Sequence, residues 1–217
     1  FIDPVRIAAG VRFWRDNAAA LARAEREFGV PAEIIVGIIG VETIYGRNMG
    51  SFRVIDALAT LSFDFPDAHP RAAQRVAFFR GELESFLSTE SRTAEDPFAP
   101  LGSYAGAMGM PQFMPSSIAK YAVDYDGNGR IDLVGSPTDV IGSVANYFKA
   151  FGWEPGRPAI FPVSFDEARL NKPVLLAPDI LPTFSADSFG AAGAVLPPAV
   201  RQYDGLLALI ELQNGYD

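Results

Sequence analysis

The sequence predicts a mainly α-helical region over residues 1–155 and a smaller mixed lobe over residues 156–217. Three observations support this fold class. Apolar residues in the first part recur at helical spacing, and Pro and Gly separate one periodic stretch from the next. After Trp153 the prolines become dense, and short extended runs such as AIFPVSF and LLALIEL replace the periodicity. We expect the small Pro-rich lobe to pack on the helical region.

The expected helices begin and end at residues typical of helix termini. Asp3–Pro4 has the form of an N-cap followed by a first-turn proline, and the helical pattern then continues to Phe28, before Gly29. Pro31 opens a second helix, which closes near Gly46. The remaining expected helices cover residues 54–63, 70–87, a short stretch after Pro115, and the segment from Ser136–Pro137 to Gly152.

Composition and charge exclude several function classes. The net charge is -8, and an acidic surface repels phosphate backbones, so we expect no nucleic acid partner. The chain has no cysteine, which excludes disulfides, zinc–thiolate sites and cysteine nucleophiles. Its apolar runs are shorter than the roughly 20 residues that span a bilayer. Because the chain begins at Phe1 without Met, we interpret it as processed or trimmed, and a preceding signal or lipid anchor stays open.

Glu42 is the first candidate for chemistry. On a helix, Ile39, Ile38 and Ile35 lie three, four and seven positions before it. A carboxyl group against isoleucine side chains loses water, and the loss raises its pKa toward the range that a general acid needs. The alternative is that Glu42 faces solvent at the helix end, beside polar Thr43.

The other ionisable residues of the helical region indicate less. His69 lies in a DAHPR turn without a visible partner, so a Ser-His-Asp triad is not expected. Four glutamates occur in mixed-charge helices and are predicted to lie on solvated faces: Glu25, Glu27, Glu82 and Glu84.

The segment DYDGNGRIDL has the spacing of an EF-hand calcium loop. Positions 1, 3, 5, 7 and 9 of that loop are occupied by Asp124, Asp126, Asn128, the Arg130 carbonyl and Asp132, and Gly129 stands at position 6. Position 12, usually a bidentate Glu, is Gly135, but Asp139 can supply the missing carboxylate. Hard oxygen ligands suit Ca²⁺. The alternative is a set of Asp, Asn and Gly turns that form without metal.

The segment GSYAGAMGMPQFMPSS, residues 102–117, combines small residues with binding groups. Glycines allow a backbone to approach a ligand closely, Ser103 and Gln112 offer polar groups suited to the acetamido group of a sugar, and Tyr104, Met108 and Phe113 offer flat apolar contacts. The alternative is a packed loop whose Met and Phe side chains enter the core.

These segments together resemble the membrane-bound lytic transglycosylase B family, glycoside hydrolase family 103. The matching stretches span roughly residues 3–155, in the family's order: VPAEIIVGIIGVETIYGRNMG, RVIDALATLSFDFP, FFRGELESFL, GSYAGAMGMPQFMPSS and DVIGSVANYFKAFGW. The resemblance implies a lysozyme-like helical fold with an EF-hand-like loop at 124–139. It also implies cleavage of the MurNAc–GlcNAc β-1,4 bond of peptidoglycan, with Glu42 acting first as acid and then as base to form a 1,6-anhydro ring.

The same resemblance implies roles for further residues. Ser103, Met108 and Gln112 would line the sugar subsites, Tyr147 would lie close to Glu42, and Phe78 would be an aromatic residue of the groove where some members have Tyr. A structural Ca²⁺, with no organic cofactor, would be held by Asp124, Asp126, Asn128, the Arg130 carbonyl and Asp139. The family's Arg-Tyr-Asn segment has no counterpart before Asp217, so we expect the C-terminal lobe to be incomplete.

Three alternative functions stay open. The first is a lysozyme-type hydrolase that uses Asp56 or Asp64 as a second carboxylate. The second is a non-catalytic peptidoglycan-binding protein, and the third, less favoured, is a calcium sensor. The resemblance implies a periplasmic protein, with anchoring to the outer membrane left open, and we expect a monomer.

Overall fold

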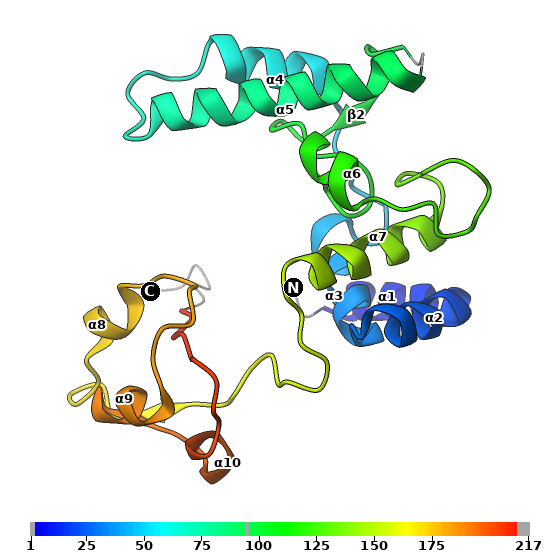
Figure 1. Cartoon of the computed structure of the whole chain (residues 1–217). Coiled ribbons are helices and arrows are strands. Elements are labelled where there is room, and N and C mark those ends of the chain that lie inside the picture. The colour runs from blue at the N-terminus through cyan, green and yellow to red at the C-terminus, as the bar shows by residue number, and fades with distance from the viewer. Residues whose placement is uncertain (1–2, 94–95, 212–217) are drawn as a thin grey trace. The chain divides into compact units, whose positions relative to one another are not determined.

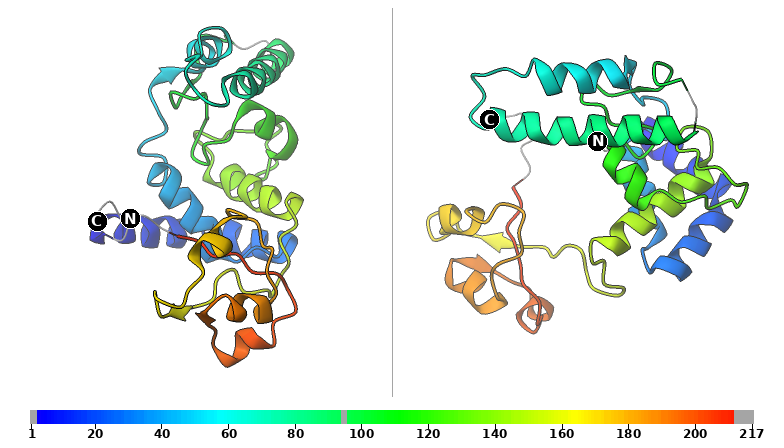
Figure 2. Two further views of the ribbon diagram at one scale, coloured as in Figure 1. Left: turned by 90° about the vertical axis from the view of Figure 1, so that its left-hand side faces the viewer. Right: turned by 45° about the horizontal axis from the view of Figure 1, so that its top comes forward.

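The computed structural model describes residues 3–93 and 96–211 and divides into two compact units, residues 1–155 and 156–217 (Figure 1). The larger unit contains helices α1 to α7 and the strand pair β1–β2, and the smaller unit contains α8 to α10 and the pair β3–β4. Two further views show the same elements from other directions (Figure 2). Each unit is described by itself.

Four helices of the larger unit enclose its main core: α1 (Pro4–Asp16), α2 (Ala18–Phe28), α3 (Ala32–Thr43) and α7 (Pro137–Ala150). Helix α3 contacts the other three, and α2 packs along α7. The core is apolar and well buried, and its members include Leu21, Ala24, Val30, Ile35, Ile39, Val140, Ile141 and Val144. Trp153 closes this core by donating its indole N–H to the Gly29 carbonyl at 2.8 Å.

The single helix predicted up to Phe28 is two helices. Asp3 is the N-cap of α1 as predicted, since its carboxylate accepts from the Val5 and Arg6 amides. The helix then ends at Asp16, and its C-cap is Asn17, whose side-chain amide donates to the Phe13 carbonyl at 2.8 Å. Asn competes in this way with helical hydrogen bonding, which explains the break that the apolar pattern did not reveal.

Helix α3 ends at Thr43, before the predicted end near Gly46. Ile44, Tyr45 and Gly46 follow with positive φ angles of 53°, 58° and 84°. Positive φ is costly for the β-branched Ile44, so packing must hold this turn. The Tyr45 side chain provides this packing. Its hydroxyl group occupies the space that a Cβ atom would need at Gly10 or Gly40, and its ring centroid is 5.1 Å from that of Phe13.

Helices α4 (Val54–Phe63) and α5 (Ala72–Thr93) lie side by side and share a second apolar cluster. Helix α4 has the predicted bounds, and α5 runs past its predicted end at Leu87. Strand β1 (Phe52–Arg53) pairs antiparallel with β2 (Leu101–Gly102). The short helix α6 (Pro115–Tyr121) contacts both α5 and α7, between which it lies in Figure 1.

The smaller unit combines short helices with one strand pair. The helices are α8 (Lys172–Leu176), α9 (Ala186–Ala191) and α10 (Pro198–Arg201), and β3 (Ser164–Phe165) pairs antiparallel with β4 (Ala194–Val195). Its core contains Leu175, Phe189 and Val200. The predicted extended run at 159–165 contains β3, whereas the run that begins at Leu206 contributes a single bridge, from Leu207 to Phe184, within the described residues. Across the described part of both units, no helix is long and apolar enough to span a membrane.

We expect Gly142→Ala to destabilise the protein by about 1–3 kcal/mol, since overpacking a tight core forces backbone or side chains to shift. Gly142 of α7 lies against the buried ring of Tyr125, and an added Cβ would overlap it. The matched control is Gly81→Ala on α5, where a Cβ meets nothing within 4 Å. That change should be neutral or stabilising, because Ala favours helix. Urea unfolding measures both, and equal effects of the two changes would contradict the packing argument.

Candidate active site and metal-binding loop

Glu42 lies in the last turn of α3, at the edge of the main core. Its side chain is exposed, as the alternative interpretation expected, while Ile35 and Ile39 before it are fully buried. Partial burial nevertheless raises the pKa of the Glu42 carboxyl group above its ordinary value. Within the described part of the chain, no hydrogen bond or ion pair to this carboxyl group is found, so no described side chain competes with a ligand for its oxygens.

Thr43, which the sequence suggested only as a polar neighbour, is fully buried. Its hydroxyl group donates to the Met110 carbonyl at 2.8 Å and accepts from the Gly46 amide at 3.1 Å. Its own carbonyl accepts from the Asn48 amide at 2.9 Å. The residue after Glu42 therefore ties the end of α3 to the segment 103–114, which we call the binding loop.

The binding loop is held by backbone hydrogen bonds within it and by one to Leu133. Met108 and Phe113 exchange two backbone hydrogen bonds of 2.8 and 3.1 Å, and Met110 donates its amide to the Leu133 carbonyl at 2.8 Å. The glycines serve packing: a Cβ at Gly106 would meet Leu58, and one at Gly109 would meet the Leu133 carbonyl. The alternative of a packed loop thus accounts for these glycines.

The two polar residues predicted to bind sugar also stabilise the binding loop. The Ser103 hydroxyl oxygen accepts from the Ala107 amide at 3.0 Å, which leaves the hydroxyl proton to donate elsewhere. The Gln112 side-chain amide donates to the Met49 and Gly109 carbonyls at 3.1 and 3.0 Å. Gln112 itself has a φ of 51°, an uncommon value that these two bonds hold in place.

The apolar residues of the predicted site lie in two different clusters. Met108 packs against the α4–α5 cluster, and the exposed Phe78 contacts Phe79 edge to face, with ring centroids 5.1 Å apart. Tyr147 belongs to a cluster on α7, where its ring lies 5.2 Å from that of Phe113 and 4.5 Å from that of Phe151. The contacts found for Tyr147 and Phe78 in the described residues do not include Glu42, although Tyr147 does contact the binding loop.

Glu82 corrects one sequence prediction. It was expected on a solvated face, and Glu25, Glu27 and Glu84 are indeed exposed. The side chain of Glu82 is instead only 4% exposed. Its carboxylate accepts from the amide of Ser116 at 2.8 Å and from the Ser116 hydroxyl group at 2.6 Å. The sequence could have predicted this burial, because Glu82 lies three positions after Phe79 and four before Phe86, on the same helix face.

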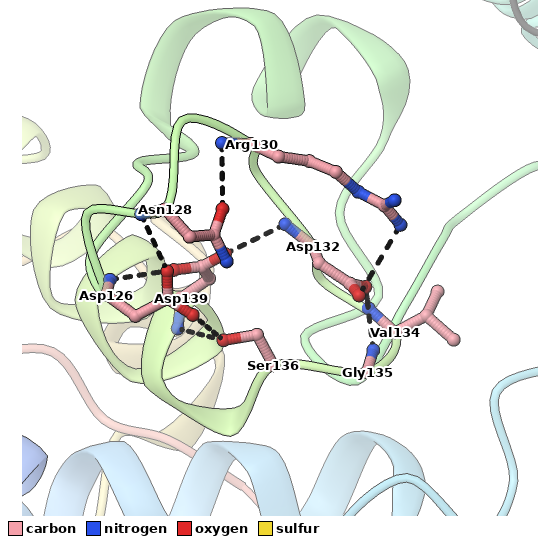
Figure 3. Close-up of polar contacts among 8 residues, drawn as sticks. All are labelled: Asp126, Asn128, Arg130, Asp132, Val134, Gly135, Ser136 and Asp139. Atoms are coloured by element: carbon pink, nitrogen blue, oxygen red, sulfur yellow. Dashed lines mark hydrogen bonds and ion pairs between the residues drawn. The ribbon is translucent and has the colours of Figure 1, made fainter.

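The EF-hand-like loop brings three carboxylates together. One oxygen each from Asp124, Asp126 and Asp139 lies within 4.8 Å of the others. Asp139 is fully buried at the start of α7, and its oxygens accept from the Tyr125 amide at 2.7 Å. They also accept from the amides of Asp126 and Asp132 at 3.1 and 2.9 Å (Figure 3). The loop backbone is therefore wrapped around the Asp139 side chain.

Asp124 is held ionised by the turn that follows it. Burial alone would raise its pKa, but the amides of Gly129, Gly127 and Asn128 donate to it and hold the pKa below its ordinary value. Asp132 has a different role: it accepts from the Val134 and Gly135 amides at 2.9 and 2.7 Å (Figure 3). It stabilises the turn at Gly135, the residue that takes the place of the usual glutamate.

Tyr125 attaches the EF-hand-like loop to α2. Tyr125 stands between Asp124 and Asp126 in the sequence, and its side chain is buried. Its hydroxyl group donates to the Glu27 carboxylate at 2.8 Å. The Arg23 guanidinium lies 3.8 Å from the ring centroid and donates to the Tyr125 carbonyl at 2.8 Å. Burial and the Glu27 acceptor raise the pKa of the Tyr125 hydroxyl group, so it stays a hydrogen-bond donor.

Known proteins resemble this chain in both sequence and structure. The transglycosylase SLT domain family model matches residues 1–179. The membrane-bound lytic murein transglycosylase B of Escherichia coli (strain K12) is 54% identical over 156 residues, which are 72% of this chain and 41% of that protein.

Two solved structures extend the comparison. The E. coli lytic transglycosylase Slt35 in complex with calcium is 45% identical with a TM-score of 0.77, covering 94% of this chain and 61% of that one. SltB3 of Pseudomonas aeruginosa in complex with NAG-anhNAM-pentapeptide is 32% identical with a TM-score of 0.72, covering 92% and 52%. The chain therefore spans about half of the length of these relatives.

These matches confirm the predicted mainly helical fold and its resemblance to the lytic transglycosylases. Because the family model covers most of the chain, at residues 1–179 of 217, the chain belongs to the transglycosylase SLT domain family.

Proposed function

We propose that this chain is the catalytic part of a lytic transglycosylase, which cleaves the MurNAc–GlcNAc β-1,4 bond of peptidoglycan with Glu42 as its one acid and base. The observation that carries the proposal is the state of Glu42. In a chain of this family, its carboxyl group has a pKa raised by burial and oxygens that no described residue engages. The names of the relatives support the same substrate and reaction.

The proposed reaction uses one carboxyl group twice. Protonated Glu42 donates its proton to the glycosidic oxygen as the bond from that oxygen to C1 of the muramyl residue breaks. The carboxylate then takes the proton of the muramyl 6-hydroxyl group while that oxygen bonds to C1, so Glu42 is protonated again and a 1,6-anhydro ring has formed. Because the attacking hydroxyl group belongs to the substrate, neither an activated water nor a second carboxylate is needed.

The binding loop supplies the proposed substrate contacts. Ser103, Met108 and Gln112 stand on one loop that Thr43 fastens beside Glu42, so substrate held by the loop would be held close to the acid. The Ser103 hydroxyl proton and the Gln112 side-chain carbonyl suit the acetamido groups of GlcNAc and MurNAc. We propose Tyr147 and Phe78 as further aromatic contacts for the glycan strand.

A lysozyme-type hydrolase has less support. Asp56, a candidate second carboxylate, pairs with Arg53 at 2.6 Å, and Asp64 ends α4 on an exposed surface. Nothing in these surroundings supports Asp56 or Asp64 as the second carboxylate that would activate a water molecule opposite Glu42. A non-catalytic glycan-binding protein would bind peptidoglycan without cleaving it, so cleavage by the native chain and its loss on substitution of Glu42 separate the proposals.

We expect Glu42→Gln to lower the rate of peptidoglycan cleavage by about 10²- to 10⁴-fold, the usual contribution of a general acid or base, while glycan binding is retained. Glu33→Gln, at an exposed position in the first turn of the same helix, should keep full activity. Mass spectrometry of digested peptidoglycan provides the measurement. With the native chain and the Glu33 variant, we expect products that carry 1,6-anhydro ends.

Products heavier by one water would instead identify a hydrolase. Unchanged cleavage in the Glu42 variant would contradict its role. The pH dependence gives an independent check: because the acid must be protonated and its pKa is raised, the rate should fall as pH rises through a pKa above the ordinary value for glutamate.

We further propose that the loop at 124–139 holds a structural Ca²⁺. The proposed ligands are the side chains of Asp124, Asp126, Asn128 and Asp139 and the Arg130 carbonyl. The donor set fits this ion, since hard oxygens predominate and three carboxylates lie within 4.8 Å without an intervening cation among the described residues. A bound divalent cation would neutralise their repulsion and fix the loop. The calcium complex of Slt35 supports the assignment.

Calcium at a hundred times its Kd should stabilise the folded state by about 2.7 kcal/mol and raise the Tm by about 5–10 °C, and EDTA should reverse the shift. Asp126→Asn should abolish most of the shift, whereas Asp64→Asn on α4 should retain it. Scanning calorimetry with and without Ca²⁺ measures the effect. An equal shift in both variants, or an equal shift with Mg²⁺, would contradict a calcium site in this loop.

We propose a periplasmic location, because the proposed substrate is cell-wall peptidoglycan. Attachment to a membrane is proposed by analogy with the E. coli relative, whose name describes it as membrane-bound. A monomer is proposed, because the reaction as written needs only residues of one chain.

A further inference from the structure

Glu82 is a buried carboxylate that the proposed reaction does not use. It lies on the face of α5 that carries the buried Phe79 and Phe86, and only 4% of it is exposed. Among the ion pairs of the described residues, Glu82 takes part in none. Burial of an unpaired carboxylate is unfavourable, and an apolar side chain of similar size would often be as stable. Its presence therefore calls for a role other than packing.

The two hydrogen bonds of Glu82 join its carboxylate to the first turn of α6. The N-cap of this helix is Met114, whose side chain makes no capping hydrogen bond, and Pro115 has no amide proton. Glu82 accepts instead from the Ser116 amide and the Ser116 hydroxyl group. A side chain of α5 thus replaces the cap that the sequence of α6 lacks, and it fixes the position of Ser116.

Ser116 stands just after the binding loop. At its other end, the loop begins at β2, which the pairing with β1 holds in place. Between these ends lie Met108, which packs on the same α4–α5 cluster as Phe79 and Phe86, and Gln112, with its φ of 51°. The Gln112 backbone needs fixed flanks to keep this conformation, and Ser116 is only four residues away.

We propose that Glu82 is a positioning residue for glycan binding: through Ser116 it holds the C-terminal end of the binding loop so that Met108 and Gln112 face the substrate. This inference rests on the proposed function, since it takes the loop as the site of glycan contact. Glu82 touches no substrate in this role and acts only through the loop.

The variants distinguish positioning from general stability. Glu82→Leu removes both hydrogen bonds, whereas Glu82→Gln can keep both, because its carbonyl accepts from the Ser116 amide and its amide donates to the Ser116 oxygen. Ser116→Ala removes only the hydroxyl bond and is the milder change. Glu84→Gln, on the exposed face of the same helix, is the matched control.

The methionines provide a local readout without any activity. The chain has four, Met49, Met108, Met110 and Met114, and all lie in the binding loop or in the segment that Gln112 contacts. Methyl-¹³C labelling of methionine therefore gives four NMR signals from this region. In the free protein, Glu82→Leu should shift or broaden the Met108 and Met114 signals, while Glu82→Gln and Glu84→Gln should match the native spectrum.

Chitotetraose, a GlcNAc oligosaccharide, serves as the binding probe. All variants are compared on the Glu42→Gln background, so that no cleavage occurs. Glu82→Leu should weaken binding about tenfold, the effect expected if the loop then holds its binding conformation only about a tenth of the time, and Ser116→Ala should weaken it less. In the cleavage assay with Glu42 intact, Glu82→Leu should raise KM and leave kcat within about twofold, a pattern that marks lost binding.

Native methionine signals in Glu82→Leu would overturn the inference. So would an equal loss in Glu82→Gln, or a fall in kcat that simply follows the folded fraction. If Glu82→Leu does not fold, Ser116→Ala decides by the same signals. If the native chain neither binds chitotetraose nor cleaves peptidoglycan, the proposed function fails, and the methionine spectra still decide whether Glu82 fixes the loop.

Discussion

The hydrogen bond from the Thr43 hydroxyl group to the Met110 carbonyl joins the helix that carries Glu42 to the loop that carries Ser103, Met108 and Gln112. Thr43 is fully buried, so the loss of this bond would leave polar atoms without water to replace it. The strained turn at Ile44 and Tyr45 depends on the same hydroxyl group, which also accepts from Gly46. The proposed acid and its proposed binding groups are thus held together by one small side chain.

The EF-hand-like loop extends this network to the other side of the core. Leu133 of this loop accepts from the Met110 amide, and Tyr125, between Asp124 and Asp126, is fixed by Arg23 and Glu27 of α2. A continuous set of contacts therefore runs from α2 through the loop to Met110 and so to Thr43. A structural calcium ion in this position would act on the candidate site by limiting the movement of that backbone.

Features that depend on local sequence could be predicted. The Asp3 cap, the bounds of α4 and the Pro137 start of α7 follow from cap residues and apolar spacing, and the acidic spacing at Asp124 and Asp126 indicated their convergence. The break at Asn17 could not be predicted, because the apolar pattern continues across it. Thr43 and Glu82 were missed for another reason: each acquires its role from a partner 67 or 34 residues away, Met110 or Ser116.

The indole of Trp153 bonds to Gly29 across 124 residues, and α2 packs along α7 over a similar separation. At roughly 5–20 residues per second, a ribosome needs about 6–25 s to add that length of chain. Throughout that interval Leu21, Ile35 and Ile39 have no α7 to cover them. The core that these side chains share with α7 can therefore close only after synthesis has passed residue 153, and until then their apolar surface is open to association with other chains.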